Sequence, residues 1–146
     1  METLLLDTSY LGEVARVRRG GQPLRSFTPE IAQRLQDALL AISPFTIAEV
    51  RAGWAIAGWG ERRIVEAQHE LDLYLQIPLD PTIVDEWARL RAHARSMGHD
   101  GISHNDLWIA ATACARSIPL VACDGDFAKI RGALTTELVW LPPDGS

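Results

Sequence analysis

The chain has 146 residues, of which 47% are hydrophobic, so it is long enough to form one domain around a single core. Its formal net charge is −5, which excludes a protein that binds nucleic acid through an overall positive charge. Its two cysteines exclude a disulfide scaffold, the N-terminus has no signal-peptide pattern, and no apolar stretch reaches the roughly 18 residues that a membrane span needs. We therefore expect a cytoplasmic protein.

Strands and helices are expected to alternate along the chain. Short apolar runs predict strands at 3–6, 38–42, 76–79, 119–122 and 137–141. Apolar residues at helical spacing, most of them after a capping residue or a proline, predict helices at 7–17, 29–37, 44–57, 61–75, 81–97, 104–117 and 125–130. Several strands are apolar without alternation, which predicts an α/β fold with a parallel sheet that helices cover on both faces.

Four acidic residues lie where such a fold would bring them to one edge. Asp7 and Asp124 end the apolar runs LLLD and PLVACD, and Glu49 and Asp106 lie near the start of predicted helices. The carboxyl ends of parallel strands share one edge of the sheet, and the following helices begin there. Two carboxylates about 4 Å apart repel by about 4 kcal/mol at the effective dielectric of a protein surface. A cluster of these acids would therefore favour a bound divalent cation, Mg²⁺ or Mn²⁺.

Each acid also has a simpler interpretation when it is taken alone. Asp7 is a candidate cap of the first helix, and Asp106 and Asp124 are candidates to complement helix dipoles. Glu49 alone is an ordinary solvated residue of a helix. Spacing in the sequence leaves both interpretations open.

Four motifs, in this order, resemble those of the PIN-domain family and, within it, the VapC-type ribonuclease toxins of bacterial toxin–antitoxin pairs. The motifs are LLLDTSYL around Asp7, FTIAEVRAG around Glu49, NDLWIAATA around Asp106, and PLVACDGDF with Asp124 and Asp126. Together they extend over nearly the whole chain. The resemblance implies a single PIN domain over residues 1–146, built as a three-layer α/β/α sandwich with a central, mainly parallel five-stranded sheet.

The resemblance also implies a function. It indicates a metal-dependent endoribonuclease, in which a metal-activated water hydrolyses RNA phosphodiester bonds to leave a 5′-phosphate and a 3′-hydroxyl. The implied cofactor is Mg²⁺ or Mn²⁺. The implied partners are RNA, a cognate antitoxin protein and a second copy of the chain in a homodimer.

The resemblance assigns roles to individual residues. The implied catalytic acids are Asp7, Glu49, Asp106 and Asp124. The implied metal ligands among them are Asp7, Asp106 and Asp124. Asp126 competes with Asp124 for the fourth position, and Ser9 matches a small polar position that supports the first aspartate. Ala122 and Cys123 depart from the family, which often has Thr and then Asn or Arg there.

The aromatic residues divide into two groups. Three lie on the helices expected at 44–57 and 61–75 and in the residues between them, exceed what a small core needs, and predict a groove for a partner: Trp54, Trp59 and Tyr74. The resemblance places the C-terminal segment of an antitoxin in that groove. Three further tryptophans are expected in the core: Trp87, Trp108 and Trp140.

Other interpretations remain open from the sequence. A housekeeping RNA-processing nuclease and a non-catalytic acidic binding module both fit the same acids. A phosphatase of the haloacid-dehalogenase type needs a second acid two residues after the first, and position 9 is serine. Four arginines near the loop expected at 18–27 either guide RNA or belong to a solvated loop: Arg16, Arg18, Arg19 and Arg25.

Overall fold

The structure is a computed structural model that describes residues 1–18, 20 and 28–141, without the side chains of 16–18. Its strands are β1 (Thr3–Leu6), β2 (Leu39–Ile42), β3 (Leu75–Gln76), β4 (Leu120–Ala122) and β5 (Leu138–Trp140). Its α-helices are α1 (Thr8–Arg18), α2 (Pro29–Asp37), α3 (Pro44–Ile56), α4 (Glu61–Leu71), α5 (Pro81–Ser96), α6 (His104–Arg116) and α7 (Gly125–Lys129). A short 3₁₀ turn, Arg131–Ala133, follows α7.

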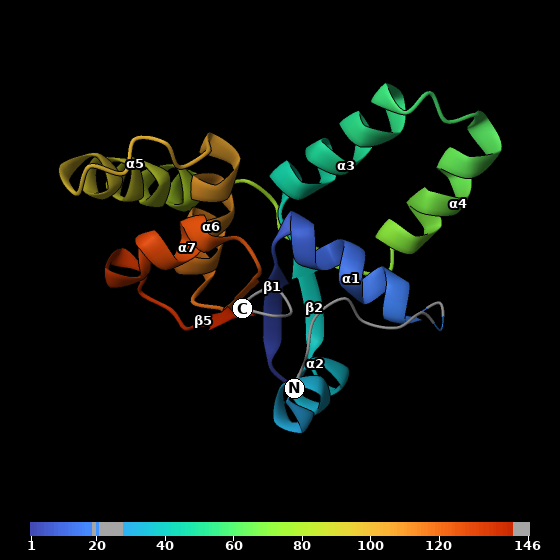
Figure 1. Cartoon of the computed structure of the whole chain (residues 1–146), viewed down its shortest axis with the longest axis horizontal. Coiled ribbons are helices and arrows are strands. Elements are labelled where there is room, and N and C mark those ends of the chain that lie inside the picture. Colours follow the sequence, from blue (N-terminus) through green and yellow to red (C-terminus); the bar gives the residue numbers. More distant parts are fainter. Residues whose placement is uncertain (19, 21–27, 142–146) are drawn as a thin grey trace.

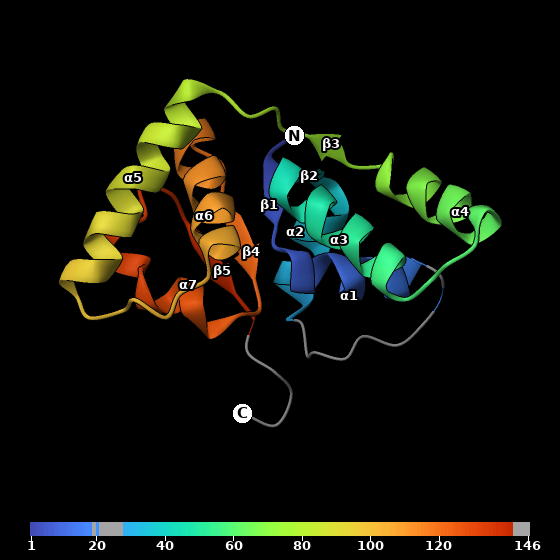
Figure 2. The same ribbon diagram turned by 90° about the horizontal axis from the view of Figure 1, so that it is seen from above.

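The five strands form one sheet in the order β3-β2-β1-β4-β5, and every neighbouring pair is parallel. Helices α5, α6 and α7 pack on one face of the sheet, and α1, α3 and α4 pack on the other (Figures 1 and 2). This arrangement confirms the predicted α/β/α sandwich with a parallel five-stranded sheet.

The apolar run of β1 shows why the strands lack alternation. Leu4 and Leu6 point into the core beneath α1 and α3, whereas Leu5 points into the core beneath α5 and α6. All three side chains are at most 1% exposed. A strand that is covered on both faces has no solvent-facing position, so the period-2 pattern of an exposed sheet is lost.

The sheet brings three strand ends to one edge. β1, β2 and β4 end at Leu6, Ile42 and Ala122, and the register pairs Leu6 with Val121. The residues that follow these ends, Asp7 and Cys123 among them, therefore lie close together. The backbone N–H of Asp7 donates to the carbonyl of Val121 (3.0 Å), so the pairing continues one residue past β1.

Two predicted elements differ from the structure by more than one residue at an end. Helix α4 ends at Leu71 rather than at residue 75, and the following strand is Leu75–Gln76 rather than 76–79. The chain turns between them, where the N–H of Tyr74 donates to the carbonyl of Leu71 (3.2 Å) and Leu73 is 66% exposed. The i, i+3 spacing of two buried residues, Leu71 and Tyr74, resembles a continuing helix, and this resemblance explains the error.

The predicted core is correct for two of the three tryptophans. Trp87 and Trp108 are half-buried and pack against the core beneath α5 and α6. The prediction for Trp140 is wrong, because it lies on the edge strand β5 and is 40% exposed. An edge strand has a neighbour on one side only, which leaves a large side chain partly in solvent.

Some predictions lie outside the described residues. These include most of the loop expected at 18–27, the side chains of Arg16 and Arg18, and all of Arg19 and Arg25. Both cysteines, Cys114 and Cys123, are buried, and no disulfide joins them. Within the described ranges, no helix combines the length and the apolar character that crossing a membrane requires.

Candidate metal centre

Three of the predicted acids converge at the edge where the strands end. Asp106 lies in the first turn of α6, Asp124 caps the N-terminus of α7, and Asp126 lies in the first turn of α7. One carboxylate oxygen from each lies within 4.8 Å of the others. We call these residues the three-carboxylate cluster. Both Asp124 and Asp126 belong to it, although the sequence presented them as competitors for one position.

Local capping fixes where these carboxylates lie. The hydroxyl of Ser103 accepts the N–H of Asp106 (3.1 Å) and so begins α6, and Oδ1 of Asp124 accepts the N–H of Asp126 (2.9 Å) and begins α7. Helix α7 has only five residues, and its fully buried Phe127 attaches it to the core. The positions of the two capping residues and of Phe127 therefore determine where the carboxylates of the cluster lie.

Asp7 lies beside this cluster and is itself only 2% exposed. Its Oδ1 accepts the N–H of Tyr10 (2.6 Å), which caps α1, and its Oδ2 accepts the N–H of Cys123 (3.0 Å). Burial raises the pKa of Asp7, the backbone N–H groups of Cys123, Tyr10 and Asp124 lower it, and the charge of Asp124 raises it. The helix cap of the simpler interpretation is therefore present, and the carboxylate, with about four lone-pair sites for three N–H donors, can still accept a further ligand.

Asp106 is held in conditions that disfavour its charge. Burial is the largest cause and the charge of Asp124 the next, and together with Asp126 and Asp7 they raise the pKa of Asp106 to about 7, while a hydrogen bond from the Ser103 hydroxyl to the carboxylate lowers it. A nearby cation would reverse this effect, because an opposite charge favours the ionised carboxylate. The chemistry of the donor set thus fits Mg²⁺ or Mn²⁺, which prefer carboxylate oxygen.

The acids differ in the positive charge available to them. Lys129 Nζ lies 3.1 Å from Oδ1 of Asp126 and partly balances its charge. Asp124 forms no ion pair with any residue that the structure describes, and it is exposed. A bound cation would therefore neutralise charge that is unbalanced on Asp124 and already partly balanced on Asp126.

Glu49 and Ser9 stand apart from the cluster. Glu49 is not among the residues whose oxygens lie within 4.8 Å of one another, and its Oε1 lies 3.0 Å from the hydroxyl of Thr8. Ser9 is exposed, and the donors to Asp7 in the described part of the chain are backbone N–H groups rather than its hydroxyl. The roles of both residues stay predictions.

The departures at 122 and 123 have a structural explanation. Cys123 contributes its backbone N–H to Asp7, and any residue other than proline supplies that group. Ala122 is fully buried in the sheet, and Asp124 is supported by the N–H of Asp126 instead of a hydroxyl at 122.

The sequence interpretation missed three hydroxyl residues near the acids: Thr8, Thr46 and Ser103. A serine three positions before Asp106 is a helix-cap signal that was available in the sequence. The contact of Thr8 with Glu49 joins residues 41 positions apart, and no local pattern indicates it.

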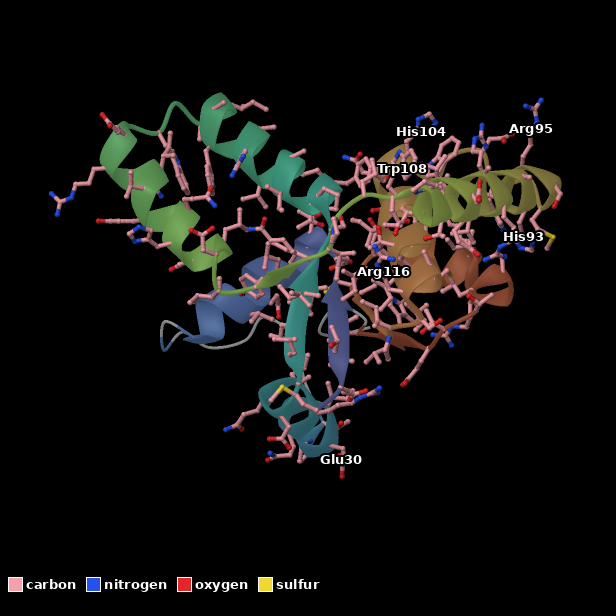
Figure 3. All side chains as sticks on the ribbon, turned by 180° about the vertical axis from the view of Figure 1, so that it is seen from behind. Glu30, His93, Arg95, His104, Trp108 and Arg116 are labelled. Carbon is pink, nitrogen blue, oxygen red and sulfur yellow. The ribbon has the colours of Figure 1, made fainter. Side chains whose placement is uncertain are left out.

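The other face of α6 is used for packing. Trp108 stacks between Phe45 of α3 (ring centroids 4.7 Å apart) and Trp87 of α5 (5.1 Å). His104 meets Trp87 edge-on with centroids 5.7 Å apart, and Figure 3 shows it beside Trp108 near α5. These aromatic contacts fix α6, and with it Asp106, relative to α3 and α5.

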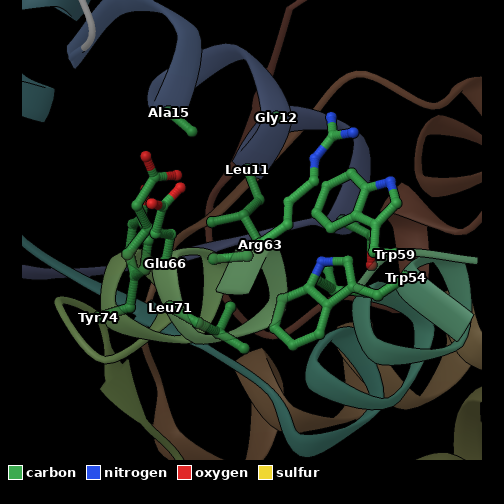
Figure 4. A pocket seen from close by; sticks show the side chains of 13 residues that line it. Leu11, Gly12, Ala15, Trp54, Trp59, Arg63, Glu66, Leu71 and Tyr74 are labelled. Carbon is green, nitrogen blue, oxygen red and sulfur yellow. The ribbon is translucent and has the colours of Figure 1, made fainter. Parts of the chain in front are cut away.

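A groove of about 610 Å³ lies between α1, α3 and α4. All three predicted residues line it: Trp54, Trp59 and Tyr74. Trp54 and Trp59 lie nearly parallel with centroids 6.3 Å apart, and the guanidinium of Arg63 lies 3.8 Å from the Trp59 ring (Figure 4). Thr8 also lines the groove, so it extends to the residue next to Asp7.

Replacing Asp106 by Asn should stabilise the metal-free protein at neutral and alkaline pH. Because the pKa of Asp106 is raised from 3.8 to about 7, the folded state holds a proton that the unfolded chain has lost between these values, and stability falls as pH rises through that window. In a chelator at pH 8, Asp106→Asn should therefore raise the Tm by a few degrees, at about 3 °C per kcal/mol. Near pH 4 the two proteins should melt together, as followed by circular dichroism.

The matched control is Asp85→Asn, which removes an exposed acid of α5 that forms no ion pair in the described part of the chain. It should leave the Tm unchanged at both pH values. A Tm of Asp106→Asn equal to or below that of the wild type at pH 8 would show that burial and the neighbouring charges do not disfavour the ionised Asp106.

Comparison with known proteins agrees with this fold. The family model for the PIN domain matches residues 4–133. Ribonuclease VapC5 of Mycobacterium tuberculosis is 33% identical over 117 residues, which are 75% of this chain and 85% of that protein.

Solved structures have the same architecture, among them a member of the VapBC family of toxin–antitoxin systems. The crystal structure of VapBC-5 from M. tuberculosis has a chain that is 27% identical, with 96% of this chain and 99% of that chain covered and a TM-score of 0.65. FitAcB from Neisseria gonorrhoeae has one that is 26% identical, with 92% and 95% covered and a TM-score of 0.67. By its motifs, its sheet and the extent of the family match, the chain belongs to the PIN domain family.

Proposed function

We propose that this chain is a divalent-metal-dependent endoribonuclease and the toxin of a toxin–antitoxin pair. The main support is the three-carboxylate cluster beside buried Asp7, at the edge of a parallel sheet where ligands of open α/β folds bind. The relative that is 33% identical is a ribonuclease, which favours an enzyme over a non-catalytic acidic module. A housekeeping nuclease stays the alternative, and the homodimer stays a prediction.

The proposed metal ligands are Asp7, Asp106 and Asp124, with Glu49 as a direct or water-mediated ligand. When bound, Mg²⁺ or Mn²⁺ lowers the pKa of water and neutralises charge on phosphate oxygens. Asp124 is favoured over Asp126 for the fourth position, since Lys129 already pairs with Asp126. Asp7, fixed by two backbone N–H groups, gives the site one carboxylate whose position does not depend on side-chain freedom.

The first test is cleavage of RNA by the purified protein with Mn²⁺. We expect products with a 5′-phosphate and a 3′-hydroxyl, and loss of cleavage in Asp106→Asn. This variant is more decisive than Asp7→Asn, because Asn at position 7 also breaks a buried hydrogen bond at a cost of about 1–3 kcal/mol. Asp106→Asn is expected to be the more stable protein, so lost activity could not be attributed to unfolding.

Asp85→Asn again serves as the control and should cleave like the wild type. Full activity of Asp106→Asn, or activity of the wild type in a chelator, would remove the metal from the proposal. Absence of cleavage with every divalent metal would favour the binding module.

The groove between α1, α3 and α4 is the proposed site for the antitoxin. Several solved structures with this fold are of toxin–antitoxin complexes, and at least one of them is above 25% identical. The groove offers an apolar floor with Arg63 and Trp59 on one side and Glu66 across from them (Figure 4). Such a surface suits a segment with apolar side chains for the floor and charged side chains for the rim.

Truncation of the aromatic wall tests this assignment. The small protein encoded immediately upstream of this chain should co-purify with it when the two are co-expressed. Trp59→Ala should weaken that complex by about tenfold or more, since buried aromatic anchors dominate interface energies. The control is Trp140→Ala, which truncates a 40% exposed tryptophan on β5.

RNA cleavage by free Trp59→Ala should equal that of the wild type. An equal loss of binding in both tryptophan variants would place the partner elsewhere. Absence of any upstream protein that binds would favour the housekeeping nuclease.

A further inference from the structure

A series of hydroxyl groups leads from the end of β2 to Glu49. The Thr8 hydroxyl oxygen lies 3.0 Å from Oε1 of Glu49 and 3.1 Å from the hydroxyl oxygen of Thr46. The hydroxyl of Ser43, the residue that follows β2, lies 3.4 Å from that of Thr46. Glu49 is thus connected to the strand ends although it lies outside the three-carboxylate cluster.

The number of protons sets the direction of these bonds. Each hydroxyl has one proton to donate, and a carboxylate oxygen only accepts. Both contacts of Thr8 can form together only when Thr8 donates to Glu49 and accepts the proton of Thr46. Thr46 then is free to accept the weaker bond from Ser43. Hydrogen bonds aligned in one direction polarise and strengthen each other.

The surroundings make this arrangement rigid. Ser43 and Thr46 are both 0% exposed, and Ser43 also accepts the N–H of Thr46 (3.1 Å) as the N-cap of α3. Thr8 follows Asp7 directly and begins α1. The hydroxyls are therefore held by β1, β2 and α3 rather than by the side chain that they bind.

We infer that Thr8 and Thr46 are positioning residues, which hold the Glu49 carboxylate at the edge of the sheet where Asp7 lies. This inference rests on the proposed function, in which Glu49 binds the divalent ion directly or through a water molecule. The groups that orient a ligand carboxylate affect metal affinity almost as much as the ligand does. Thr8 does not itself contact the ion in this account.

The test measures Mn²⁺ affinity by calorimetry in four proteins of a double-mutant cycle: the wild type, Thr8→Val, Glu49→Gln and the double variant. Thr8→Val keeps the shape of threonine and removes its hydroxyl, and it should weaken Mn²⁺ binding by about tenfold. In the double variant, the loss should equal that of Glu49→Gln alone, because Thr8 acts through Glu49. Thr8→Ser, which restores a hydroxyl, should have a Mn²⁺ affinity within about threefold of that of the wild type, in contrast to the roughly tenfold loss in Thr8→Val.

The matched control is Thr82→Val, because the hydroxyl of Thr82 also donates to a carboxylate, that of Asp80 (2.6 Å), at the start of α5. Its Mn²⁺ affinity should equal that of the wild type. Wild-type affinity in Thr8→Val, losses that add in the double variant, or a Thr8→Ser as weak as Thr8→Val would each overturn the inference. A wild type that binds no Mn²⁺ would instead overturn the proposed function, and the inference with it.

Discussion

Repulsion among carboxylates at one edge of the sheet is the constraint on which the site depends. The parallel arrangement forces β1, β2 and β4 to end together, and the residues after β1 and β4 include Asp7 and Asp124. The caps of α6 and α7 then add Asp106 and Asp126. Burial raises the pKa of Asp106 most, and repulsion from Asp124, Asp126 and Asp7 raises it further. Carboxylates held together at this cost in stability favour a ligand that offsets the cost.

The cluster, the hydroxyl series and the groove meet at the start of α1. Asp7 fixes the segment after β4, Thr8 contacts Glu49, and Thr8 also lines the groove. A partner segment that fills the groove would therefore lie next to the proposed metal edge. The aromatic packing of Trp108 against α3 and α5 fixes the side of α6 opposite to the cluster. The helix that carries Asp106 is therefore held in place by packed side chains.

The fold was predictable because its signals are local. Capping residues, prolines and apolar runs located the helices and strands, and the four motifs gave the family. The distances between the acidic side chains were not predictable, because the position of a residue along a helix indicates which way its side chain points and not how far it lies from another element. Glu49 lies outside the three-carboxylate cluster and its role stays a prediction, and Asp126 was set against Asp124 although both join the cluster. The end of α4 was wrong since Leu71 and Tyr74 keep helical spacing through a turn, and Trp140 was misplaced because a strand pattern does not indicate which strand is at the edge.

The most direct measurement is the anomalous X-ray scattering of Mn²⁺ in crystals of the protein grown with the ion. We predict a manganese peak at the carboxylates of Asp7, Asp106 and Asp124, next to Asp126. In crystals of Asp106→Asn, the peak should disappear or lose most of its occupancy. A manganese peak that lies away from these residues, or no peak in crystals of a protein that cleaves RNA with Mn²⁺, would contradict the account.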